Sequence, residues 1–193
     1  MKKLSIAIGS VSILFSVAIG AQLAFAPLSL SKTSKVWVDG TSNVRSFSCA
    51  AATIQADVAG ETTGEPGSAV KSATLVIPVA SLDCKNGTMN EHMLKALKAK
   101  TNPTIVFRLA SYELAKQADV VRVTLAGTLA MGGVEKPVSM TVEASEGASG
   151  MLHVVGTHEL RMTEWGLKPP TLMLGTMKVD ERVKVGFDLL LKD

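Results

Sequence analysis

Apolar and polar residues alternate through the middle of the chain. After Pro103, apolar residues stand at every second position in 105–109 and again in 121–129. Because successive side chains of a β-strand point to opposite faces, this pattern predicts strands with one buried face and one wet face. Gly132-Gly133 ends the alternation and suits the positive φ angles of a tight turn. We therefore predict a hairpin, with Pro137, which has no N–H to donate, at the first position of its second strand.

Further alternating segments flank this hairpin. Residues 73–81 alternate, with Pro78 on the face opposite the apolar set, and residues 151–161 and 183–189 alternate as well. Closely spaced strands, one short helix and no helical crossover predict an all-β fold, either an antiparallel barrel or a sandwich. A barrel of about eight strands can hold one small ligand in its interior.

One short amphipathic helix is predicted from about Met89 to Lys100. Thr88 and Glu91 have the spacing of a capping box, in which each side chain bonds to the backbone amide of the other residue. Met89, Met93 and Leu97 repeat every four residues and define an apolar face. Such a helix can bury this face by lying across a barrel end, so we predict a lid. The alternative is that the same three side chains only plug the core.

Composition and charge exclude some functions. With 193 residues, 47% of them hydrophobic, the chain can form one domain with a real core. The formal charge is +3 and includes Lys2 and Lys3, and aromatic residues make up 4%. Nucleic-acid binding is therefore not expected, because it needs a dense basic face or stacking aromatics.

Catalytic and metal-binding motifs are also missing from the sequence. His92, His153 and His158 lack His-x-x-x-His spacing, and the chain has no Gly-x-Ser-x-Gly elbow and no phosphate-binding glycine loop. We expect no metal, no catalytic residues and no enzyme activity.

The N-terminus has the pattern of a secretory signal. Met1-Lys2-Lys3 precedes an apolar run from Leu4 to Ala21, and Ala24-Phe25-Ala26 has the small-x-small form of a cleavage site. We predict a signal peptide over residues 1–26, a linker over 27–35 and one domain over 36–193, in a periplasmic or secreted protein. Two alternatives remain. Because Pro27 would directly follow a cut after Ala26, cleavage could instead occur after Gly20 or Ala21. The apolar run could also be retained as a membrane anchor.

Cys49 and Cys84 are the two cysteines of the chain. In an exported protein an even cysteine count favours a disulfide, which would stabilise the fold by about 3 to 4 kcal/mol in the chain-entropy model. A redox or metal-binding pair is the alternative, although the two residues lack Cys-x-x-Cys spacing.

Several motifs together resemble those of one family. The central segment Gly127-x-Leu129-x-x-x-Gly133-Val134-x-Lys136-Pro137-Val138, preceded by Asn-Pro-x-Ile-x-Phe at 102–107, resembles the signature of the YceI family. Four other segments resemble further patterns of this family and occur in the same order along the chain. They are Trp37 before Asp39-Gly40-Thr41-Ser42, Ser81-Leu82-Asp83, Asn90-x-His92-Met93-Leu94 and Arg161-Met162-Thr163-Glu164-Trp165-Gly166-Leu167. The Ala-rich segment 50–67 departs from the family pattern, and we expect it to shorten two strands.

The resemblance implies a single lipocalin-like β-barrel with the short helix near a barrel end. It further implies an exported protein that holds an amphiphilic polyisoprenoid or quinone-like chain in an apolar lumen, as a carrier or reservoir and without a cofactor. Two alternatives are a ligand-free structural or interaction domain with a filled core, and a hydrolase or redox protein. Transient membrane contact and a homodimer are kept as candidate interactions.

The family motifs and the alternation each select candidate ligand-binding residues. Asn90, His92 and Arg161 are the head-group candidates, because they lie in segments that resemble family motifs beside the barrel ends. The predicted lumen positions are Leu75, Ile77, Val79, Ile105, Phe107, Leu109, Val123, Leu125, Met140, Val142, Val185 and Phe187, with Trp165 and Met173 near a rim.

Overall fold

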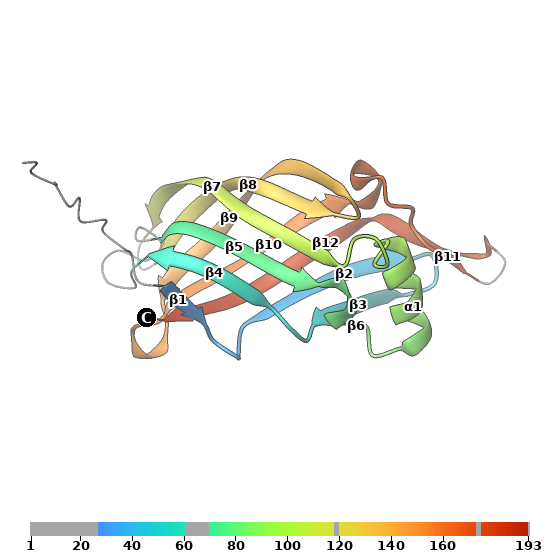
Figure 1. Cartoon of the computed structure of the whole chain (residues 1–193), viewed down its shortest axis with the longest axis horizontal. Helices are drawn as coiled ribbons and strands as arrows, with labels where there is room; N and C mark the ends of the chain where they lie inside the picture. The colour runs from blue at the N-terminus through green and yellow to red at the C-terminus, as the bar shows by residue number, and fades with distance from the viewer. Residues whose placement is uncertain (1–26, 61–69, 118–119, 173–174, 193) are drawn as a thin grey trace, which may run out of the picture.

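A computed structural model describes residues 27–60, 70–117, 120–172 and 175–192 (Figure 1). The predicted signal peptide and Met173 lie outside these residues. The described part forms an all-β barrel with one helix, α1 (Gly87–Ala96). Its strands are β1 (Pro27–Leu30), β2 (Lys35–Ser42), β3 (Ser46–Ala51), β4 (Gln55–Gly60), β5 (Val70–Pro78), β6 (Leu82–Asp83), β7 (Thr104–Gln117), β8 (Val120–Met131), β9 (Val134–Glu146), β10 (Leu152–Arg161), β11 (Thr171–Leu172) and β12 (Met177–Lys192).

The sheet closes on itself because β1 pairs with both β4 and β12. Every pairing is antiparallel, and the closed path runs β1-β4-β5-β7-β8-β9-β10-β12. Three positions in the barrel are each shared by two short strands. β1 and β2 both pair with β12, β3 takes the position of β4 and pairs with β2, and β6 takes the position of β5 and pairs with β3. The architecture is therefore the predicted antiparallel barrel of eight strands, three of which are interrupted.

One of the three interruptions, between β3 and β4, lies in the part of the sequence that departs from the family pattern. Strands β3 and β4 are separated by residues 52–54, and β5 and β6 by the 3₁₀ turn Val79–Ser81. Hydrogen bonds join the two breaks: the Ala52 amide donates to the Ser81 carbonyl at 2.8 Å, and the Ser81 hydroxyl donates to the Thr53 carbonyl at 3.2 Å. The barrel wall thus stays continuous where backbone pairing stops.

The central hairpin is present with the predicted turn. Gly132 and Gly133 have φ of 59° and 87°, and β8 pairs with β9 from Val121 to Met131. The position predicted for Pro137 is wrong, because β9 begins three residues earlier, at Val134. Pro137 is tolerated inside the strand because β9 pairs with β10 only from Val142 to Glu146. At Pro137 the strand therefore has one partner, and no N–H is needed on the other side.

Another 3₁₀ turn, Met162–Trp165, follows the part of β10 that no longer pairs with β9. The side chain of Trp165 is 2% exposed, and its indole N–H donates to the Leu129 carbonyl at 3.2 Å. Met131, Leu160, Trp165 and Leu167 form one buried cluster there. This cluster fills the side of the barrel that β9 and β10 leave unpaired.

Helix α1 begins earlier than predicted, and the predicted capping box is not its N-cap. The N-cap is Asn86, whose side-chain oxygen accepts a hydrogen bond from the Met89 amide at 3.0 Å. Asn is among the preferred N-cap residues, and its position places Thr88 inside the first turn. The helix ends at Ala96, short of the predicted Lys100, and lies with β11 at the barrel end opposite the C-terminus (Figure 1).

Candidate functional site

The barrel encloses a cavity of about 680 Å³. Alternating side chains of the closed strands line it, and most are Val, Leu, Ile, Met or Phe. This volume lies within the range of about 300 to 1,000 Å³ that is usual for sites that bury a small molecule. The geometry therefore gives the chain an apolar space that its own side chains do not fill.

Glycines keep this space open. Phe107 packs over Gly127 of the neighbouring strand, and Phe187 packs over Gly156. A Cβ atom at these glycines would come within 2.8 Å of the Phe107 ring and 2.6 Å of the Phe187 ring. Because a larger side chain would displace the rings, these glycines let two bulky aromatics lie against the wall instead of across the lumen.

In the part of the chain that the structure describes, the cavity meets the surface at one end and is closed by buried side chains at the other. A buried cluster that includes Leu28, Val58, Val121, Leu152 and Leu191 packs at the end that holds β1 and the end of β12. Of the described lining residues, three are exposed, and all lie beside α1 or the β2–β3 turn: Arg45, Asn86 and Thr88. We call this opening the mouth of the cavity.

Helix α1 lies across the mouth. Met89, Met93 and Leu97 line the cavity and are half-buried, and none of the helix residues is fully buried. The predicted apolar face thus points toward the lumen without packing into a filled core. This position suits a lid.

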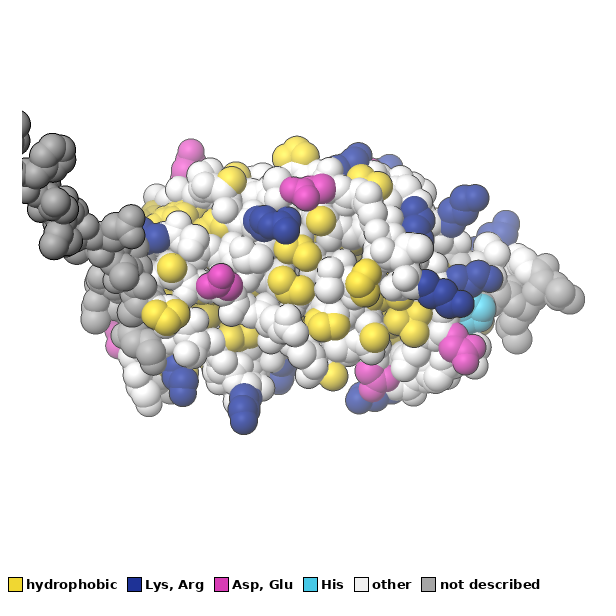
Figure 2. Space-filling view, viewed as in Figure 1, with side chains coloured by type: hydrophobic (Ala, Val, Ile, Leu, Met, Phe, Trp, Pro, Cys, Tyr) yellow, Lys and Arg dark blue, Asp and Glu magenta, His cyan; other side chains and the backbone are white. Residues whose placement is uncertain are grey.

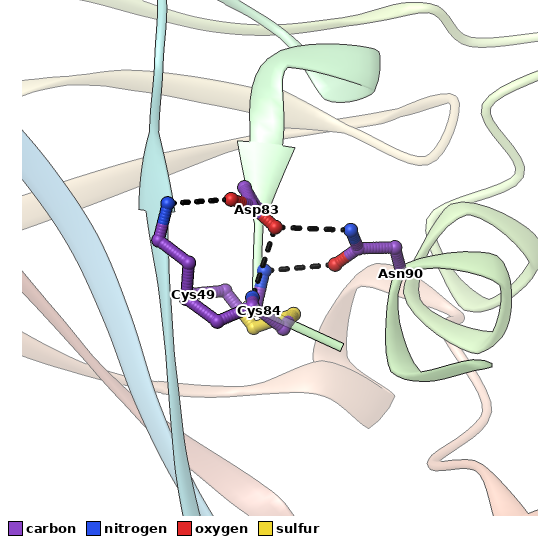
Figure 3. Close-up of polar contacts among 5 residues, drawn as sticks. Cys49, Asp83, Cys84 and Asn90 are labelled. Atoms are coloured by element: carbon purple, nitrogen blue, oxygen red, sulfur yellow. Dashed lines mark hydrogen bonds and ion pairs between the residues drawn. A yellow bond between two sulfur atoms is a disulfide. The ribbon is translucent and has the colours of Figure 1, made fainter. Parts of the chain in front are cut away.

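A disulfide and a polar network attach the start of the lid to the barrel wall (Figure 3). Cys49 of β3 and Cys84, which follows β6, form the predicted disulfide. Asn90 of α1 accepts a hydrogen bond from the Cys84 amide at 2.8 Å and donates to the Asp83 carboxylate at 3.1 Å. Hydrogen bonds from the Lys85 side chain and from Asn90 lower the pKa of Asp83 to about 2. The network therefore keeps its carboxylate ionised at ordinary pH.

We expect the double replacement of Met93 and Leu97 by serine to speed the release of a ligand from the cavity. Both side chains are half-buried, so stability should fall by about 1 to 3 kcal/mol, less than for fully buried residues. Serine at Glu91 and Lys95, on the exposed face of α1, is the matched control. The exchange of a fluorescent fatty probe and thermal unfolding measure the two effects, and identical values for both pairs would contradict a lid.

The structure places eleven of the fourteen predicted lumen residues on the cavity wall. Val79 does not line the cavity, because β5 ends at Pro78 and Val79 is buried in the following 3₁₀ turn. Trp165 is buried in the cluster beside β9, away from the cavity lining. The eleven are Leu75, Ile77, Ile105, Phe107, Leu109, Val123, Leu125, Met140, Val142, Val185 and Phe187.

The three head-group candidates differ in position. His92 lines the cavity near the mouth. Asn90 is engaged with Cys84 and Asp83, and Arg161 lies 3.5 Å from the Glu181 carboxylate on the outer surface; neither lines the cavity. The geometry therefore brings His92 to the site and leaves the other two outside it.

Several polar lining residues were not predicted from the sequence, among them Tyr112, His158 and Arg45. A bulge between Leu109 and Ser111 changes which residues of β7 face inward, and it turns Tyr112 toward the cavity. No local sequence pattern predicts this bulge. His158 occupies one of the alternate positions that hold the apolar residues in 152–160, so the alternation could have predicted that it faces inward. Burial lowers the pKa of His158, while the Glu159 carboxylate opposes this shift. Arg45 stands in a polar turn and has no such signal.

Within the described ranges, no group of three or more His, Cys, Asp or Glu side chains is arranged to hold a metal ion. In the same part of the chain, no helix is long and apolar enough to cross a membrane.

Comparison with known families agrees with this architecture. The sequence matches the profile of the YceI-like domain over residues 29–191. The chain belongs to the YceI family. The matched range runs from within β1 to within β12 and includes α1. No curated protein sequence matches the chain with significance.

Solved structures share the YceI fold at low sequence identity. BcnA of Burkholderia cenocepacia is 21% identical with a TM-score of 0.69, over 84% of this chain and 99% of that one. A polyisoprenoid-binding domain from Saccharophagus degradans, implicated in plant cell wall breakdown, is 15% identical with a TM-score of 0.64, over 89% and 99%. The YceI protein of Campylobacter jejuni is 15% identical with a TM-score of 0.58, over 96% and 99%.

Proposed function

We propose that this protein is an exported lipid-binding protein that holds an amphiphilic polyisoprenoid or quinone-like chain in its lumen, as a carrier or reservoir. The observation that carries the proposal is the open apolar cavity of about 680 Å³ with a single described mouth. The polyisoprenoid-binding domain of S. degradans, which shares the fold, supports this ligand class. The signal-like N-terminus and the disulfide, which is typical of oxidising compartments, support export.

The free energy of binding would come from burial. Each Å² of apolar ligand surface removed from water contributes about 25 cal/mol, which must offset the lost freedom of the chain. A prenyl tail is apolar along its whole length, and the lumen offers it an apolar wall from the mouth to the closed end. The protein therefore needs no catalytic group and no cofactor for this role.

The head group of the ligand would lie at the mouth. His92 lines the cavity there, and the exposed Arg45, Asn86 and Thr88 line it beside the solvent. These four side chains offer hydrogen-bond donors and acceptors to a polar group, while the tail extends into the apolar part. An amphiphile fits this gradient in polarity better than a uniformly apolar molecule does.

We expect Leu125→Phe to reduce the amount of bound lipid severalfold while the barrel survives. Leu125 lines the cavity on β8, and the larger ring would occupy part of the lumen at a cost of about 1 to 3 kcal/mol in stability. Thr124→Phe adds the same ring one residue away on the exposed outer face and is the matched control. Lipid extraction from both purified variants measures the effect, and equal lipid content in the two would contradict a lumenal site.

A further inference from the structure

The mouth of the cavity is bordered by basic side chains. Three parts of the described chain surround it: residues 43–46 between β2 and β3, residues 84–101 with α1, and residues 166–172 and 175–178 before and into β12. These segments contain one acidic residue, Glu91. Their basic residues, which we call the basic collar, are Arg45, Lys85, Lys95, Lys98, Lys100, Lys168 and Lys178, and all seven are exposed.

The charges of the collar are mostly uncompensated. Lys85 pairs with Asp83 at 2.7 Å, and the Lys98 ammonium group donates to the Gly132 carbonyl at 3.4 Å. Apart from Lys85, the collar residues form no ion pair with another described residue. On the outer barrel wall, by contrast, Arg108 lies 3.7 Å from Glu135 and His153 lies 2.8 Å from Asp188. Figure 2 shows Lys and Arg side chains gathered at the end that carries α1.

An apolar side chain stands among these cations. Val44, at the tip of the β2–β3 turn, is 64% exposed, next to Arg45. A surface that combines several cations with a projecting apolar side chain has the features of an interfacial membrane contact: the cations meet anionic head groups, and the apolar group enters the head-group layer. Nucleic acid would be expected to engage stacking aromatics or a larger basic face, and the collar contains no aromatic residue.

We propose that the basic collar docks the mouth of the cavity onto an anionic lipid bilayer. The inference rests on the proposed lipid-binding function, because a prenyl chain that leaves a bilayer for the lumen must otherwise cross water. Docking through the collar turns the mouth and the lid toward the bilayer, so the chain passes from one apolar medium to another. The collar thus determines where the protein exchanges its ligand, and the lumen determines what it holds.

The test compares two triple variants of the full chain, produced and processed in the same way. Lys95→Gln, Lys100→Gln and Lys168→Gln remove three collar charges that neither line the cavity nor form an ion pair within the described residues. Lys32→Gln, Lys35→Gln and Lys184→Gln remove three exposed charges from elsewhere on the barrel, so net charge changes equally. Co-sedimentation with vesicles of phosphatidylcholine, with or without phosphatidylglycerol, measures binding, and thermal unfolding checks the fold of each variant.

We expect the parent protein to bind the phosphatidylglycerol vesicles and to lose binding as salt is raised. The collar variant should bind roughly a hundredfold more weakly, at about a factor of five per charge near an anionic surface, while the control stays near the parent. Failure of the parent to bind anionic vesicles, or equal losses in both variants, overturns the docking proposal; an acidic protein partner would give the first of these outcomes.

Lipid extracted from the same samples separates the two proposals. Lipid present in the parent without collar-dependent vesicle binding rejects docking and leaves the lipid-binding function standing. Collar-dependent binding by a protein that carries no lipid supports docking and rejects the carrier role.

Discussion

Replacing Phe107 by aspartate is expected to prevent the barrel from folding. Phe107 lines the lumen and packs over Gly127, so the change removes an aromatic contact worth about 3 to 5 kcal/mol and places a carboxylate in an apolar space. No basic side chain lines the cavity beside it; the described lining residue with a fixed positive charge is Arg45, at the mouth. The total loss approaches the roughly 5 to 15 kcal/mol by which domains are stable.

The measurement is soluble yield followed by denaturant unfolding. Ser139→Asp, which places the same carboxylate on the exposed outer face of β9, is the control and should shift stability by no more than about 0.5 kcal/mol. Phe107→Leu keeps the site apolar and should fold with an intermediate stability. A stable, folded Phe107→Asp protein would show that the barrel interior is wet, contrary to the proposed lipid site.

Removing the disulfide by replacing Cys49 and Cys84 with alanine is expected to lower stability by about 4 kcal/mol. The two cysteines are 35 residues apart, and closing a loop of that length restricts the unfolded chain by this amount in the chain-entropy model. Cys84 also stands directly before the lid and donates its amide to Asn90. The freed lid segment should therefore release ligand faster than in the parent protein.

Chemical denaturation with and without a reductant measures the stability change, and probe exchange measures the release. Reduction should reproduce the double replacement in the parent and leave the variant unchanged. Thiol titration of the denatured parent should find no free thiol. Equal stability of parent and variant would show that β3 and β6 are held together without the covalent bond.

Local patterns were sufficient for most of the barrel. Alternation within a strand separates its inner face from its outer face, and it selected Leu125, Val142 and Val185, which line the cavity. The hairpin at Gly132-Gly133 was equally local, because a tight turn needs positive φ at both positions. The disulfide followed from a count of two cysteines, without any knowledge of the fold.

Long-range geometry accounts for what the sequence did not predict. The bulge that turns Tyr112 inward exists because β7 must curve around the closed barrel, and its position depends on its pairing with β8. Val79 lies outside the lumen, contrary to the prediction, because β5 is interrupted beside the break between β3 and β4. Arg45 reaches the mouth only because the β2–β3 turn comes to the same barrel end as α1.

Native mass spectrometry of the protein, purified without detergent from the cells that produce it, tests the central claim most directly. We predict a bound species whose extra mass matches an isoprenoid lipid in chloroform extracts of the same sample. Leu125→Phe should lose most of this species, and Thr124→Phe should retain it. A parent protein that shows only the mass of its own polypeptide, with no lipid in the extract, would contradict the lipid-binding function.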